Sequence, residues 1–77
     1  MPWNPQLTEH ETAVLRLLAR GHTHTEVAKI LGVRPDIAGQ LISRVRIVLR
    51  ARTVAHAVAI GYETGILALK SDAAEGS

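Results

Sequence analysis

Five arginines fall between positions 34 and 52 of this 77-residue chain, and Asp36 is the only acidic residue in the same stretch. They are Arg34, Arg44, Arg46, Arg50 and Arg52. A guanidinium group is permanently charged and donates paired hydrogen bonds that match the oxygens of a phosphate. The whole chain has a net charge of only +2, so its positive charge is concentrated in one segment. This segment is predicted to bind phosphate groups, although a solvated helix face has the same composition.

Other side chains that carry chemistry form no recognisable site in the sequence. His22 and His24 are close along the chain, but two imidazoles in a turn fall short of a metal site. The chain has no cysteine, which excludes a disulfide framework and a thiolate zinc site. His10, Glu11 and Ser43 do not have the spacing of a nucleophile, a base and an orienting partner. We therefore expect no metal, no cofactor and no enzymatic activity.

Length and composition limit the elements that position these groups to one small domain. The chain is 47% hydrophobic, but its only aromatic residues are Trp3 and Tyr62, which suits closely packed helices better than a deep pocket. No apolar run approaches the roughly 18 residues of a membrane span, and the start lacks the regions of a signal peptide. We expect a cytoplasmic protein without membrane contact. An N-terminal arm is predicted at 1–6, a folded domain at 7–69 and a disordered tail at 70–77.

Two Thr-x-x-Glu sequences, beginning at Thr8 and Thr23, have the form of a capping box, in which both side chains satisfy amide donors at a helix start. Apolar residues follow each of them at helical spacing. The pattern predicts helices at about 8–20 and 23–31, the second of them ending at Gly32.

A longer helix is predicted at 35–49, since Pro35 suits a first helical position. Its apolar residues recur every three or four positions: Ala38, Leu41, Ile42, Val45 and Leu49. Thr53 is the predicted cap of a fourth helix at about 53–64. The fold class is therefore all-α with four helices. A short capped helix, a glycine turn and a longer basic helix form a helix-turn-helix, whose second helix enters the major groove of DNA.

Particular residues extend this pattern over most of the chain. They are Leu7-Thr8, Glu11, Val14-Leu15-Arg16-Leu17-Leu18-Ala19, Gly21, Thr23, Glu26-Val27-Ala28, Leu31-Gly32-Val33, Ile42, Val45, Leu49, Ala57-Val58 and Gly65-Ile66-Leu67. Together they resemble the LuxR/GerE-type DNA-binding domain, without a gap from Leu7 to Leu67. The resemblance implies a transcriptional regulator that binds double-stranded promoter DNA as a homodimer. It also implies that the third helix lies in the groove and the fourth at the dimer contact.

The chain departs from that family at the start of the third helix. Ile37 and Gly39 stand where the family usually has Thr and Lys, and Leu41 stands where it often has His. At about 100° per residue, Gln40 and Ser43 point away from the apolar side of this helix, which suits contacts with base edges. The residues predicted to bind DNA are Thr25, Arg34, Gln40, Ser43, Arg44, Arg46 and Arg50. Those predicted at a dimer interface, with the core as an equal alternative, are Val54, Ala57, Val58 and Gly61.

A different class of function stays open. Ile37, Leu41 and the outward Ile47 are extra apolar groups that a surface facing only DNA does not require. They favour an interaction module that keeps the fold but binds another protein. Region four of sigma factors also contains a helix-turn-helix, but it explains the fourth helix less well. Whether the chain acts alone or as part of a longer regulator is equally open.

Overall fold

The computed structural model describes residues 5–68, and within that range it contains four helices and no strand. They are α1 (Glu9–Ala19), α2 (His24–Leu31), α3 (Pro35–Leu49) and α4 (Val54–Glu63). The predicted all-α, four-helix architecture is confirmed, and the predicted boundaries differ only by including the capping residues. Most of the predicted arm at 1–6, and the whole predicted tail at 70–77, lie outside the described residues.

Both predicted capping boxes are present. Glu11 N–H donates to Thr8 Oγ1 at 3.1 Å, and Thr8 N–H donates to a carboxylate oxygen of Glu11 at 3.0 Å. At the start of α2 the matching distances between Thr23 and Glu26 are 3.2 and 2.9 Å. Each box satisfies two backbone donors that have no partner inside the helix. Thr53 caps α4 in the predicted way, since its hydroxyl accepts from His56 N–H at 3.0 Å.

Two of the helices end in the left-handed region of backbone space. Gly32 ends α2 with φ of 70°, where a residue without Cβ is favoured. Arg50 ends α3 with φ of 58°, and it is the only non-glycine residue with positive φ in the described part of the chain. The fold therefore places an arginine where the backbone favours glycine.

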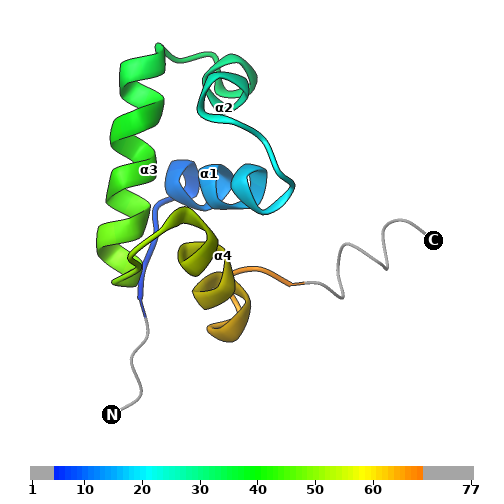
Figure 1. The fold of residues 1–77 in the computed structure, drawn as a ribbon, viewed down its shortest axis with the longest axis vertical. Helices are drawn as coiled ribbons and strands as arrows, with labels where there is room; N and C mark the ends of the chain where they lie inside the picture. Colours follow the sequence, from blue (N-terminus) through cyan, green and yellow to red (C-terminus); the bar gives the residue numbers. More distant parts are fainter. Residues whose placement is uncertain (1–4, 69–77) are drawn as a thin grey trace, which may run out of the picture.

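The longest helix, α3, contacts each of the other three. In Figure 1, α2 lies beside the N-terminal end of α3, α4 lies beside its C-terminal end, and α1 lies between them. The residues enclosed by these contacts are almost all aliphatic: Val14, Leu15, Val27, Ala28, Ala38, Ile42, Val45, Leu49, Ala57, Ile60 and Leu67. Four residues of α3 belong to this core, and the helical pattern predicted all four of them. The fifth residue of that pattern, Leu41, is only partly buried. This core fixes which side of α3 faces outward.

The helix α4 approaches α1 closely at Gly61. A Cβ atom at this position would lie 2.8 Å from Leu67 Cδ1 and 2.9 Å from Leu15 Cδ2, so a larger residue would force the neighbours to move. Ala57 is fully buried as well. Of the two roles predicted for these residues, the core is the one that Ala57 and Gly61 have, while Val54 and Val58 pack on the core with part of their surface exposed.

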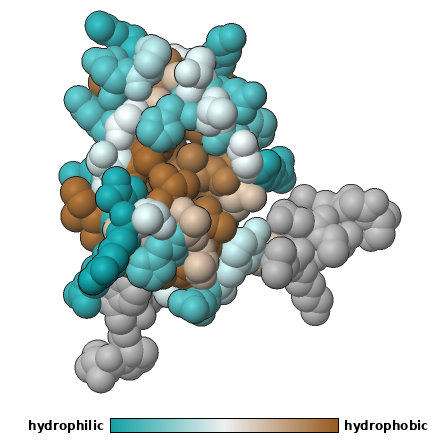
Figure 2. Space-filling model, viewed as in Figure 1, coloured by the Kyte–Doolittle hydropathy of each residue, from teal (hydrophilic) through white to brown (hydrophobic). Residues whose placement is uncertain are grey.

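The surface is mixed in character. Figure 2 shows hydrophobic residues gathered in the middle of one face, where Figure 1 draws α1 and α4, with hydrophilic residues around them. Within residues 5–68, no helix has the length and apolar character needed to cross a bilayer. The outer side of α3 is both charged and accessible.

Candidate functional site

The outward side of α3 follows from the packing of its inward side. Ala38, Ile42, Val45 and Leu49 are buried, and they are spaced so that they lie along one side of the helix. Gln40, Ser43 and Ile47 are exposed, as the helical spacing predicts for the opposite side. A long, accessible strip of side chains therefore runs along α3.

This strip borders a shallow open groove. One wall comes from the first residue of α2, and the floor comes from α3. The residues that line it are His24, Asp36, Gly39, Gln40, Ser43, Arg44, Ile47 and Val48. Three of the residues predicted to bind DNA, Gln40, Ser43 and Arg44, are thus brought together. Gly39, where the family has Lys, has no side chain and leaves the groove open at that point.

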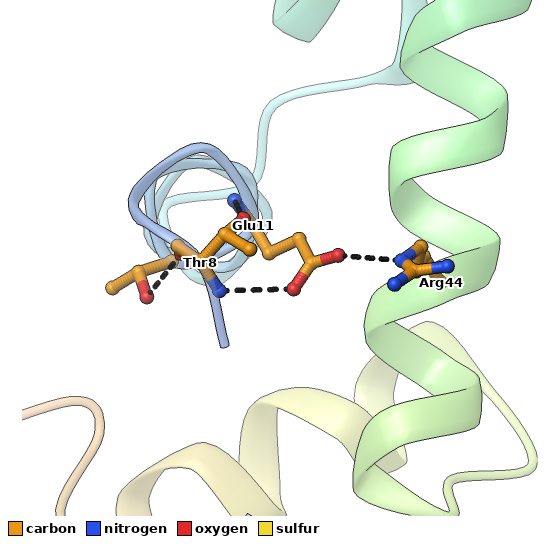
Figure 3. Close-up of polar contacts among 4 residues, drawn as sticks. Thr8, Glu11 and Arg44 are labelled. Carbon is orange, nitrogen blue, oxygen red and sulfur yellow. Dashed lines mark hydrogen bonds and ion pairs between the residues drawn. The ribbon is translucent and has the colours of Figure 1, made fainter. Parts of the chain in front are cut away.

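Arg44 reaches from α3 to the beginning of α1 (Figure 3). Its Nε donates to a carboxylate oxygen of Glu11 at 2.9 Å, while the other oxygen of Glu11 accepts from Thr8 N–H. The Glu11 side chain is 5% exposed, whereas that of Arg44 is 69% exposed. The hydrogen bond from the Thr8 amide lowers the pKa of Glu11 most; burial opposes this, and Arg44 lowers the pKa further. Glu11 is therefore a carboxylate at neutral pH.

Arg46 has a different environment from Arg44. One terminal amino group of Arg46 donates to the backbone carbonyl of Arg52 at 3.0 Å, and its Nε atom is buried. Arg52 N–H in turn donates to Nδ1 of His56 at 3.2 Å. The sequence did not indicate these contacts, which hold the connection between α3 and α4. Arg46 therefore places positive charge beside the groove, but part of its guanidinium is buried or hydrogen-bonded to the connection between α3 and α4.

The remaining predicted DNA contacts lie around the groove instead of lining it. Arg34 is the N-cap residue of α3, and its side chain makes no capping hydrogen bond. Its Nε atom lies 3.4 Å from Asp36 Oδ1. Arg50 is at the opposite end of α3, in the left-handed cap. Thr25 is exposed in the first turn of α2, next to the His24 wall of the groove. An arginine thus lies at each end of α3.

The histidine pair predicted not to bind a metal lies at the start of α2. His22 Nδ1 is 3.4 Å from a carboxylate oxygen of Glu26, so this imidazole has an acidic neighbour. That oxygen of Glu26 also accepts from Thr23 N–H, which places it in the capping box. Within residues 5–68, no three potential metal ligands cluster.

The apolar residues considered for a protein contact do not share one environment. Ile47 is 75% exposed and Ile37 is 37% exposed, but Leu41 packs, half-buried, against the core. Only part of the Leu41 surface is therefore open to a protein contact, because its position on α3 turns it toward the buried cluster. Ile47 is the apolar side chain most available in the groove.

Sequence reasoning assigned Glu11 only to a capping box and missed its bond to Arg44, 33 positions away. A signal was nevertheless present. Glu11 precedes Val14 by three residues and Leu15 by four, so it belongs to the stripe of α1 that is buried. A charged residue inside an apolar stripe needs a charged or hydrogen-bonding partner, because an unpaired buried charge is costly.

Comparisons with known proteins add no assignment to this geometry. No protein-family model matches the chain, and no curated protein matches it.

Proposed function

We propose that this chain is a sequence-specific, DNA-binding transcriptional regulator that inserts α3 into the major groove. The observation that carries the proposal is the accessible strip of Gln40, Ser43 and Arg44 along α3, beside the N-terminal end of α2. A major groove about 12 Å wide admits one α-helix. We assign α2, the turn after it and α3 to a helix-turn-helix, in which the second helix reads bases and the first crosses the backbone.

Charge around α3 supports the same function. Arg34 and Arg50 stand at its two ends, and Arg44 and Arg46 lie on either side of its outward strip. Phosphates flank the major groove on both sides, so this arrangement suits contacts with both strands. The only carboxylate on α3 belongs to Asp36, and its Oδ1 atom lies 3.4 Å from Nε of Arg34.

Roles can be assigned from the chemistry of each side chain. Gln40 pairs through its amide with the N6 and N7 edge of adenine, and Ser43 donates to or accepts from any base edge. The arginines and Thr25 bind phosphates. These roles agree with the LuxR/GerE resemblance, which implies that a dimer binds a two-fold DNA site. The partly exposed Val54 and Val58 on α4 are the residues we assign to the contact between two copies.

The proposal is tested by two substitutions that make the same change of charge and shape. Gln40→Glu places a carboxylate in the groove, whereas Gln6→Glu places one at an exposed position outside it. Labelled duplex DNA, first enriched for binding from a random pool, is titrated at several salt concentrations. We expect a loss of at least about tenfold for Gln40→Glu, since a bidentate base contact contributes about 1 to 3 kcal/mol. Gln6→Glu should bind nearly as the parent does.

A second candidate function rests on Ile47, which is 75% exposed within the groove. An interaction module would use this side chain to bind a helical or apolar segment of another regulator. The same titration separates the two functions. The interaction module is the correct function if the parent chain binds no duplex at low salt and instead retains a stoichiometric protein partner in a pull-down. Ile47→Glu should then abolish that retention.

A further inference from the structure

We infer that Glu11 is a positioning residue, which holds the guanidinium of Arg44 so that its terminal amino groups face a phosphate of the DNA backbone. The inference rests on the proposed function and adds to it a residue on α1, outside the helix-turn-helix. Glu11 touches neither the groove nor the DNA in this assignment. It acts through Arg44.

The carboxylate of Glu11 is held in place on two sides. One oxygen accepts from the backbone amide of Thr8 at 3.0 Å, and the other accepts from Arg44 Nε at 2.9 Å. The capping box fixes the side chain to the first turn of α1, and the surrounding protein leaves it 5% exposed. Figure 3 shows this relay running from the backbone of α1 to the side chain from α3. An arginine bound to such an anchor loses freedom before any ligand arrives.

The bond to Glu11 uses only the Nε donor of Arg44. A guanidinium has five N–H donors in a rigid planar fork, so fixing one of them fixes the direction of the others. Within residues 5–68, no protein group accepts from the two terminal amino groups, and the side chain is 69% exposed. Those amino groups belong to a residue that lines the α3 groove. Two oxygens of one phosphate match the pair of donors.

Positioning and simple charge predict opposite effects for removal of the carboxylate. Glu11→Gln removes one negative charge, and by long-range electrostatics alone this raises affinity for a polyanion. Positioning predicts a loss, because a single amide oxygen cannot serve both Thr8 N–H and Arg44 Nε–H. The sign of the change therefore tells the two effects apart.

The chain offers a matched control. Glu26 has the same capping-box geometry at the start of α2, with the same hydrogen bonds to a threonine, but it is exposed and binds no arginine. Glu11→Gln and Glu26→Gln are compared in the full chain, each alone and each combined with Arg44→Ala. The probe is a labelled duplex of mixed sequence at low salt, which is adequate because phosphate contacts do not depend on sequence.

We expect Glu11→Gln to weaken binding about three- to tenfold, the range expected when one side chain must be ordered on binding. In the Arg44→Ala background the same substitution should leave binding unchanged or slightly stronger, and Arg44→Ala alone should lower the slope of log affinity against log salt by about one. Glu26→Gln should leave binding unchanged or slightly stronger. A second readout needs no DNA: the Nε–H resonance of Arg44 should be sharp in the parent chain and broadened in Glu11→Gln, with circular dichroism showing that both remain helical.

Two results would overturn the inference while leaving the DNA-binding function intact. One is unchanged or tighter binding by Glu11→Gln, and the other is a loss of the same size with and without Arg44. If the parent chain does not bind the duplex at all, the proposed function fails and the inference fails with it. Each outcome thus points to a different error.

Discussion

The helices α1 and α2 begin with the same capping box and the same hydrogen bonds, but the glutamates of the two boxes have different surroundings. Glu11 at the start of α1 is buried and bound to Arg44, whereas Glu26 at the start of α2 is exposed and has His22 as its neighbour. The capping distances agree within about 0.1 Å in the two boxes. The local motif sets the backbone geometry, and the surrounding fold decides what the second carboxylate oxygen does.

This difference arises from the position of each box relative to α3. The first turn of α1 lies against the middle of α3, where an arginine side chain can reach it (Figure 3). The first turn of α2 borders the open groove instead. One box therefore connects two helices that are distant in the sequence, and the other serves only its own helix and the turn before it.

The largest expected effect is on stability when each glutamate is truncated. Glu11→Ala should lower the free energy of unfolding by about 1 to 3 kcal/mol, because it removes the acceptor of two hydrogen bonds at a buried position. Glu26→Ala should cost clearly less, since its side chain is exposed to solvent. Chemical denaturation followed by circular dichroism measures both.

Truncation of the threonines provides the control for that experiment. Thr8→Ala and Thr23→Ala should each cost about 1 kcal/mol, since each removes one N-cap acceptor of the same geometry. If the two threonine variants differ as much as the glutamate variants do, the asymmetry lies in the helix starts and not in the bond to Arg44.

A smaller effect is expected on the pH dependence of stability. Because the pKa of Glu11 is lowered from its ordinary value of 4.5, its ionised form stabilises the folded state. That contribution is fully present above the ordinary carboxyl pKa and is lost as the pH falls through the lower pKa of the folded state. Glu11→Gln should therefore flatten the loss of thermal stability between neutral and acidic pH.

The pKa of Glu26 is also lowered, mainly by the hydrogen bond from the Thr23 amide. Glu26→Gln should change the acid limb in the same direction but by less, because water screens its exposed carboxylate. Melting temperatures measured from pH 7 down to pH 3 would contradict the comparison if Glu26→Gln flattened the curve more than Glu11→Gln.

The smallest expected effect concerns the C-terminal ends of α2 and α3. Gly32 and Arg50 both have left-handed backbones, but only glycine adopts this conformation without steric cost. Arg50→Gly should be more stable than Arg50→Ala by up to about 1 kcal/mol, because both variants lack the Arg50 side chain and only glycine avoids the steric cost. Gly32→Ala should destabilise for the same reason, and an Arg50→Gly variant less stable than Arg50→Ala in chemical denaturation would contradict this.

The sequence was sufficient for the elements of the fold. Threonine caps, the glycine end of α2 and the spacing of Ala38, Ile42, Val45 and Leu49 depend on interactions within a few residues, and all are present as predicted. The outward direction of Gln40 and Ser43 follows from the same periodicity. Local rules therefore located both the helices and the side of α3 that is open to a ligand.

What the sequence did not provide depends on how helices far apart in the chain are placed. The Glu11–Arg44 pair requires the angle at which α3 meets α1. A helical projection treats each helix alone and cannot supply that angle. It gives the direction in which Arg44 leaves α3, but not the group that it meets.

The connection between α3 and α4 sets a length scale for any paired assembly. Arg46 binds the carbonyl of Arg52, and the amide of that same residue binds His56 in the first turn of α4. These two hydrogen bonds connect the end of α3 to the start of α4, and we call this connection the α3–α4 bracket. If two copies meet through α4, the separation of their α3 helices is fixed by this bracket and not by a flexible linker. Such a pair would accept half-sites at one spacing and reject those moved by a few base pairs, since each base pair also rotates the groove about the DNA axis.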